Sequence, residues 1–95
     1  MKIERSIIAI TGAAGGLGAA MARRLANQGA RLALIDFNPG MLDEFSTSLS
    51  LPSEDVLVMP CDVSDESQVD EAFEAITGHF GGLDLLINNA GITRD

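Results

Sequence analysis

Four short runs of apolar residues recur along the chain, and longer segments with a helical period of apolar residues separate them. The first run, residues 6–11, is almost continuously apolar, as expected for a strand buried on both faces of a parallel sheet. Similar runs follow at residues 31–36, 56–59 and 83–87, and the third of these ends at Pro60. Alternating strands and helices are typical of βαβ units, so the pattern predicts four parallel strands.

The first predicted helix follows a glycine-rich turn and stops at Gly29, a residue type common at helix C-termini. Its apolar residues recur at i, i+4 and i+8, with Arg23 and Arg24 on the outer side. We therefore expect its buried face to consist of Leu17, Met21 and Leu25.

The second predicted helix begins at Asn38 and Pro39, which suit an N-cap and a first helical turn. It continues through Leu42, Phe45 and Leu49, although the stretch 46–53 is weakly patterned and loop-like. We interpret the methionines of these segments as filling the core: Met21, Met41 and Met59.

The third predicted helix is capped by Ser64 or Asp65 and stopped by Gly81 and Gly82. Its apolar positions recur with helical spacing at Val69, Phe73, Ile76 and Phe80. The order βαβαβαβ predicts the amino-terminal portion of an α/β, Rossmann-type, doubly wound parallel sheet over residues 1–95. Right-handed crossovers would place helices on both faces of that sheet.

Length and composition are those of one small globular domain, with 95 residues of which 46% are hydrophobic. No apolar run approaches the ~20 residues that a membrane span needs. The first residues show no secretory signal, and Cys61 has no second cysteine with which to form an internal disulfide. We therefore expect a cytoplasmic protein with no membrane segment.

The net charge of −8 argues against a nucleic-acid partner, because phosphate neutralisation needs clustered lysine and arginine. The acidic residues concentrate between Asp36 and Glu74, and we interpret them as a solvated helix face. His79 has no second histidine or cysteine at ligand spacing, which favours a helix-end role and predicts no metal site.

A glycine-rich turn, residues 11–18, lies between the first strand and the first helix. Gly12 permits a tight bend, Gly16 lets the backbone approach a pyrophosphate, and Gly18 lets the helix pack closely on the strand. The start of the following helix offers unsatisfied N–H groups to an anion. A triphosphate-binding loop is excluded, because Gly16 is followed by Leu17 and not by lysine. An ordinary strand-to-helix turn is the alternative.

Asp36 ends the second strand twenty residues after Gly16, where an acidic group accepts hydrogen bonds from the adenosine ribose hydroxyls of a dinucleotide. A carboxylate there repels a 2′-phosphate, and neither Gly15 nor Phe37 supplies a compensating positive charge. The sequence therefore favours NAD(H) as cofactor, with NADP(H) as the alternative.

Three motifs resemble those of the short-chain dehydrogenase/reductase family: Thr11-Gly12-(x3)-Gly16-x-Gly18, Cys61-Asp62-Val63, and Asn88-Asn89-Ala90-Gly91. With Asp36 they cover the whole chain in the family's order and spacing. The resemblance implies that Asp62 meets the adenine amino group and that residues 88–91 support the sheet and line the adenosine side of the cofactor. The cofactor-binding residues expected from the turn, Asp36 and the resemblance are Gly12, Ala14, Gly15, Gly16, Leu17, Gly18, Asp36, Phe37, Asp62, Val63, Asn89, Ala90 and Gly91.

Residues 89–95 are similar to the run found in 3-oxoacyl-acyl-carrier-protein reductases and acetoacetyl-CoA reductases, although those enzymes usually prefer NADPH and Asp36 departs from that pattern. Another secondary alcohol/ketone pair is the alternative substrate. In the family that the chain resembles, the catalytic Asn, Ser and Tyr-x-x-x-Lys lie downstream of the Asn88-Asn89-Ala90-Gly91 motif, and the chain contains no tyrosine. No catalytic residue is therefore assigned.

Three hypotheses follow. The first is an oxidoreductase whose cofactor-binding portion is this chain, with a small-molecule or acyl-thioester substrate bound elsewhere and a homo-oligomeric assembly. The second is a non-catalytic dinucleotide-binding module. The third is a fragment held by self-association, because an unpaired edge on the fourth strand would favour pairing with another chain.

Overall fold

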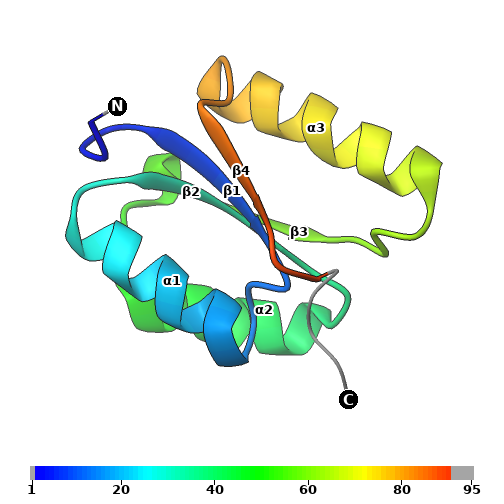
Figure 1. Ribbon diagram of the computed structural model, residues 1–95, viewed down its shortest axis with the longest axis horizontal. Coiled ribbons are helices and arrows are strands. Elements are labelled where there is room, and N and C mark those ends of the chain that lie inside the picture. Colours follow the sequence, from blue (N-terminus) through cyan, green and yellow to red (C-terminus); the bar gives the residue numbers. More distant parts are fainter. Residues whose placement is uncertain (1, 91–95) are drawn as a thin grey trace.

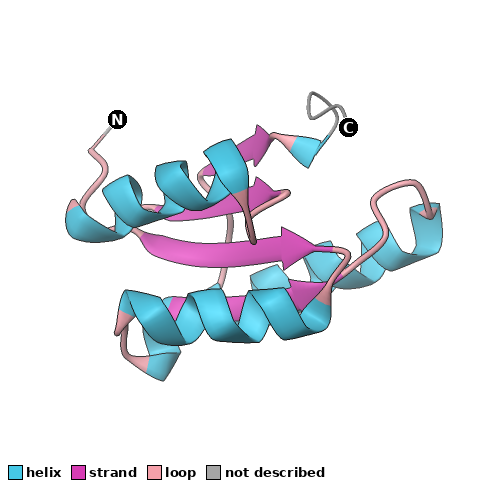
Figure 2. Ribbon diagram, turned by 90° about the horizontal axis from the view of Figure 1, so that it is seen from below, coloured by secondary structure: helices cyan, strands magenta, loops and turns pink. Residues whose placement is uncertain are grey.

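The computed structural model describes residues 2–90, in which one parallel sheet lies between two layers of helices (Figures 1 and 2). The strands are β1 (Ile7–Thr11), β2 (Arg31–Asp36), β3 (Val56–Pro60) and β4 (Leu85–Asn88), in the order β3-β2-β1-β4. The helices are α1 (Gly16–Asn27), α2 (Pro39–Leu49) and α3 (Glu66–Phe80), and a 3₁₀ turn, η1, spans Ser53–Asp55. Figure 1 shows α1 and α2 on one face of the sheet and α3 on the other. The predicted Rossmann-type doubly wound α/β fold is confirmed.

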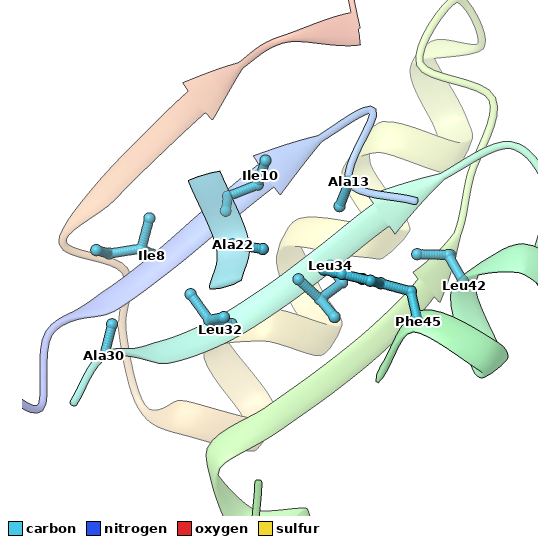
Figure 3. Packing of buried hydrophobic residues seen from close by; sticks show 9 residues of the cluster. All are labelled: Ile8, Ile10, Ala13, Ala22, Ala30, Leu32, Leu34, Leu42 and Phe45. Carbon is cyan, nitrogen blue, oxygen red and sulfur yellow. The ribbon is translucent and has the colours of Figure 1, made fainter. Parts of the chain in front are cut away.

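Alternate residues of the two central strands supply the two cores. Ile8 and Ile10 of β1 face α1 and α2, where they pack with Leu34 and Phe45 (Figure 3). The intervening residues of the same strands face α3 and pack with Ala72 and Ile76. This burial on both faces explains why the strands read as continuous apolar runs.

The buried face of α1 differs from the prediction. Leu17 is 56% exposed, and the fully buried positions are Gly18 and Ala22. Leu25 packs partly against the core, as expected, and Met21 is half-buried. The prediction was wrong at Leu17, because α1 lies so close to β1, as expected from Gly18, that the small residues Gly18 and Ala22 face the sheet.

The stretch after Phe45 is helical up to Leu49, as predicted for the second helix, so the loop-like character assigned to residues 46–49 was wrong. The hydroxyls of Thr47 and Ser48 donate to backbone carbonyls of the preceding turn, at 2.9 and 2.6 Å, and are accommodated within the helix. Ser50, with a φ of 56°, ends α2 in the left-handed region.

β4 begins at Leu85, two residues later than predicted. Asp84 donates its N–H to the Ile7 carbonyl at 2.8 Å, and its Oδ2 accepts the Ile7 N–H at 2.8 Å. A carboxylate therefore takes the place of a backbone carbonyl at the start of the β1–β4 pairing. Across residues 2–90, no helix has the length and apolarity needed to cross a bilayer.

Candidate functional site

An open groove of about 320 Å³ lies at the carboxyl ends of β1, β2 and β3. Figure 2 shows the arrowheads of the strands on the same side of the molecule, next to the connecting loops. The chain moves outward from β1 to β3 and then returns to the other side of β1 for β4, so the groove opens at a topological switch point. Its lining residues are Gly12, Gly15, Asp36, Phe37, Met41, Cys61, Asp62, Val63 and Ala90.

The glycine-rich turn brings the start of α1 to this groove. Gly12 and Gly16 have φ values of 66° and 55°, a region that favours glycine. Asn38 and Asp65 cap α2 and α3 with their side chains, but the N-cap of α1 is Gly15, which supplies none. The first-turn N–H groups of α1, which have no acceptor within the helix, are left for a ligand.

Close packing of three residues fixes the shape of the turn. A Cβ added to Gly18 would lie 2.0 Å from the carbonyl oxygen of Gly12 and 2.8 Å from Asn89 Nδ2. Asn89, which is 1% exposed, donates from Nδ2 to the same Gly12 carbonyl at 3.2 Å. Its Oδ1 is buried and has no hydrogen-bond partner among residues 2–90.

The ends of β1 and β4 are joined by a second set of hydrogen bonds. The Thr11 hydroxyl donates to Asn88 Oδ1 at 2.9 Å and accepts the Ala90 N–H at 3.0 Å. Thr11 and Gly12 therefore tie the glycine-rich turn to the end of β4 and the residues that follow it.

Asp36 connects β2 to the glycine-rich turn. Its Oδ2 accepts the Ala14 N–H at 2.9 Å, and its Oδ1 accepts the Asn38 N–H at 3.3 Å. Its backbone carbonyl accepts the Cys61 N–H at 2.8 Å, which also links it to the end of β3. The carboxylate is thus held on the wall of the groove, and no lysine or arginine is among the groove's lining residues in the described part of the chain.

Asp62 and Val63 form the wall contributed by the β3–α3 connection. Asp62 Oδ1 accepts the N–H and the hydroxyl of Ser64, at 3.0 and 2.7 Å. The Asp62 N–H donates to Gln68 Oε1 at 2.8 Å. Sequence reasoning missed Gln68, although Asp65-x-x-Gln68 matches the spacing of a helix capping box.

Cys61 lines the groove and is 5% exposed. Burial, followed by the charges of Asp62, Asp65 and Glu71, raises the pKa of its thiol, which stays protonated at neutral pH. The Cys61 thiol is therefore unsuited to act as a nucleophile.

The pKa of the Asp65 carboxyl is lowered by hydrogen bonds from the Ser67 hydroxyl and then from the Gln68 and Ser67 N–H groups.

Seven of the expected site residues line the groove: Gly12, Gly15, Asp36, Phe37, Asp62, Val63 and Ala90. Of the other expected residues, Gly18 and Asn89 are buried, and Ala14 donates its N–H to Asp36, which lines the groove. Gly16 and Leu17 are exposed at the start of α1, and Gly91 lies outside the described residues. Met41, interpreted from the sequence as core filler, is 48% exposed and lines the groove, so that interpretation was wrong. Its place in the first turn of the predicted helix, three residues after the cap Asn38, was the available signal. In the structure its Cε lies 3.8 Å from a Cβ added to Gly15.

Comparison with known proteins agrees with the fold and the motifs. A family model described as short chain dehydrogenase matches residues 6–95. The 2,3-dihydro-2,3-dihydroxybenzoate dehydrogenase of Bacillus subtilis (strain 168) is 42% identical over 92 residues, which are 97% of this chain and 35% of that protein. The 15-hydroxyprostaglandin dehydrogenase (NAD+) of Homo sapiens is 35% identical over 97 residues, covering 100% of this chain and 36% of that protein.

A solved structure extends the comparison to three dimensions. The crystal structure of 3-ketoacyl-(acyl-carrier-protein) reductase from Brucella melitensis complexed with NADH aligns with a TM-score of 0.81 and 32% identity, over 88% of this chain and 34% of that one. The chain spans about a third of the length of the curated relatives it matches. Because the family model matches nearly its whole length, the chain belongs to the short-chain dehydrogenase family of oxidoreductases.

Proposed function

We propose that the groove binds NAD(H) and that this chain is the cofactor-binding part of an oxidoreductase. The observation that carries the proposal is the position of Asp36. Its carboxylate is held on the groove wall by the Ala14 N–H, beside a helix start that has no side-chain cap. An anion-binding helix terminus next to a carboxylate suits the pyrophosphate and the adjoining ribose of a dinucleotide.

The remaining lining residues fit the rest of the adenosine. Phe37 and Val63 are 75% and 42% exposed, and they offer apolar surface to a flat base. Asp62 adds an acceptor beside them, suited to the exocyclic amino group of adenine. The position of Gly16, with a positive φ and no protein atom within 4 Å of an added Cβ, leaves room for phosphate oxygens.

The charge of the groove favours NAD(H) over NADP(H). A 2′-phosphate would lie close to the Asp36 carboxylate, and none of the lining residues within residues 2–90 is basic and could neutralise it. Two of the similar proteins agree, since the human dehydrogenase is named as an NAD+ enzyme and the Brucella melitensis reductase was solved as a complex with NADH. NADP(H) remains the alternative cofactor.

For the whole protein we propose hydride transfer between the nicotinamide and a ketone or secondary alcohol, with a 3-oxoacyl thioester of acyl carrier protein or CoA as the first substrate to assay. The relatives' names give a dihydrodiol, a hydroxyprostaglandin and a ketoacyl substrate, so other hydroxyl or keto compounds are the alternatives. Bound NAD(H) would supply the hydride acceptor or donor. The sequence contains no tyrosine, so a phenol that exchanges the substrate's proton would come from outside these residues.

We further propose a cytoplasmic, homo-oligomeric protein. Leu85 and Leu86 of β4 are 39% and 41% exposed on the edge strand of the sheet as described, and their apolar surface suits contact with the rest of a longer chain or with a second subunit. The single cysteine, Cys61, is buried and unpaired, as is common in reducing compartments.

Isothermal titration calorimetry with NADH and NADPH tests the cofactor assignment. We expect NADH to bind with a Kd between about 1 µM and 1 mM, the range usual for enzyme KM values. NADPH should bind at least about tenfold more weakly, because of the Asp36 carboxylate. Equal or tighter binding of NADPH would contradict the choice of NAD(H), and no heat from either dinucleotide at millimolar concentration would contradict the proposed site.

A further inference from the structure

Gln68 lies in the first turn of α3, outside the groove, at the position that completes a capping box with Asp65. In such a box the side chain of this residue turns back to the N–H of the N-cap residue. Here the Asp65 N–H already donates to the Asp62 carbonyl at 3.0 Å. Gln68 Oε1 accepts the N–H of Asp62 instead, at 2.8 Å, so its side chain reaches a groove residue.

The orientation of the Gln68 amide is set by its second contact. Nε2 donates to Asp65 Oδ2 at 3.3 Å, while Oε1 faces the Asp62 N–H. The reversed amide would place a donor against an N–H and an oxygen against a carboxylate, and both contacts would be unfavourable. Gln68 therefore presents an acceptor to Asp62 in one fixed orientation.

These contacts hold Asp62 on several sides. Its N–H is bound by Gln68, its carbonyl by the Asp65 N–H, and its Oδ1 by both donors of Ser64. Oδ2 is the one carboxylate oxygen of Asp62 that makes no hydrogen bond to the protein within residues 2–90. A carboxylate with one oxygen committed and the other available is pre-organised to accept a hydrogen from a ligand in the groove.

We propose that Gln68 is a positioning residue that orients Asp62 for selecting a base with an exocyclic amino group. This inference rests on the proposed NAD(H) site. A donor on the base satisfies Asp62 Oδ2, whereas a carbonyl oxygen at the same place meets a carboxylate and is disfavoured. Loss of the Gln68 contact lets the Asp62 backbone rotate, so selection between the two kinds of base weakens.

The test compares two dinucleotides on the full-length protein: NADH, and reduced nicotinamide hypoxanthine dinucleotide, in which a carbonyl oxygen replaces the adenine amino group. Gln68→Met keeps the length of the side chain and removes the amide. Gln68→Glu keeps an acceptor oxygen for the Asp62 N–H, although its second oxygen replaces the Nε2 donor that faces the Asp65 carboxylate. Ser67→Ala is the matched control, because it removes one hydroxyl contact to Asp65 from the same cap without touching Asp62.

We expect Gln68→Met to weaken NADH binding about 3- to 10-fold, the effect of one hydrogen bond. The hypoxanthine analogue should change by less than about twofold, so the preference for NADH narrows. Gln68→Glu should keep more of that preference than Gln68→Met, and Ser67→Ala all of it. Because both affinities are measured on one sample, their ratio does not depend on the fraction of the variant that is folded.

An unchanged preference in Gln68→Met, or equal losses for both dinucleotides, would overturn this inference while leaving the NAD(H) site in place. Failure of the unsubstituted protein to bind either dinucleotide would overturn the proposed function, and this inference with it.

Discussion

Replacing Gly18 by alanine is expected to abolish NADH binding and to destabilise the protein. The added Cβ would lie 2.0 Å from the Gly12 carbonyl oxygen, a backbone atom, and 2.8 Å from Asn89 Nδ2. Relief of this overlap requires α1 to move away from β1, which would displace the first-turn N–H groups from the phosphate position. Overpacking of this kind costs about 1–3 kcal/mol, and we expect the upper end because the clash is with backbone.

The matched control is Gly78→Ala in α3, where an added Cβ meets no atom within 4 Å and the backbone is helical. Alanine is favoured over glycine inside a helix by about 0.5–1 kcal/mol, so this variant should be more stable and bind NADH normally. Urea unfolding followed by far-ultraviolet circular dichroism and calorimetric titration with NADH measure both effects. A Gly18→Ala protein that melts and binds like the unsubstituted one would show that the Gly12–Gly18–Asn89 contact does not shape the site.

Two substitutions of Asp36 are expected to have different effects on cofactor choice. Asp36→Asn removes the charge but keeps an oxygen that can accept the Ala14 N–H, so we expect weaker NADH binding, stronger NADPH binding and an intact turn. Asp36→Ala also removes the acceptor, which leaves the Ala14 N–H without the partner that it has at 2.9 Å. NADH affinity should then fall by about 10- to 100-fold, as for loss of hydrogen bonds to a charged group.

The affinity for NADPH distinguishes the two roles of Asp36. If the carboxylate also holds the glycine-rich turn, Asp36→Ala gains little NADPH affinity although its charge is gone. Calorimetric titration of both variants with both dinucleotides measures this directly. Tighter NADPH binding by Asp36→Ala than by Asp36→Asn would mean that the Ala14 contact has no influence on the site.

Features that depend on local patterns could be predicted from the sequence. The strands are apolar on both faces because helices cover both, and the end of α3 follows from Gly81, whose φ of 87° suits glycine. The groove residues Gly12 and Asp36 were predicted because Gly12 directly follows a strand and Asp36 ends one, and parallel strands end at one edge of a sheet. Asp62 was predicted from the motif resemblance, and it also lines the groove.

Features that depend on distances between elements could not be predicted from the sequence. The sequence predicted that Gly18 lets α1 pack closely on β1, but the apolar period does not give the distance itself, which brings Gly18 and Ala22 to the sheet and leaves Leu17 exposed. The Asp84 side chain accepts the Ile7 N–H, and the Gln68 side chain accepts the Asp62 N–H. Each of these hydrogen bonds joins a side chain to the backbone of another segment. Periodicity carries no information about such contacts, and only the capping-box spacing marked Gln68 as a residue to inspect.

The central claim, that NAD(H) occupies the groove, is tested most directly by backbone amide NMR during titration with NADH. We predict the largest shifts in the Gly12–Gly18 turn and at Phe37 and Val63. Arg5 and Asp55 form an ion pair, 3.1 Å between Nη1 and Oδ1, before the amino ends of β1 and β3, and their amides should remain unchanged. Shifts concentrated around Arg5 and Asp55, or none in the glycine-rich turn at saturating NADH, would contradict the account.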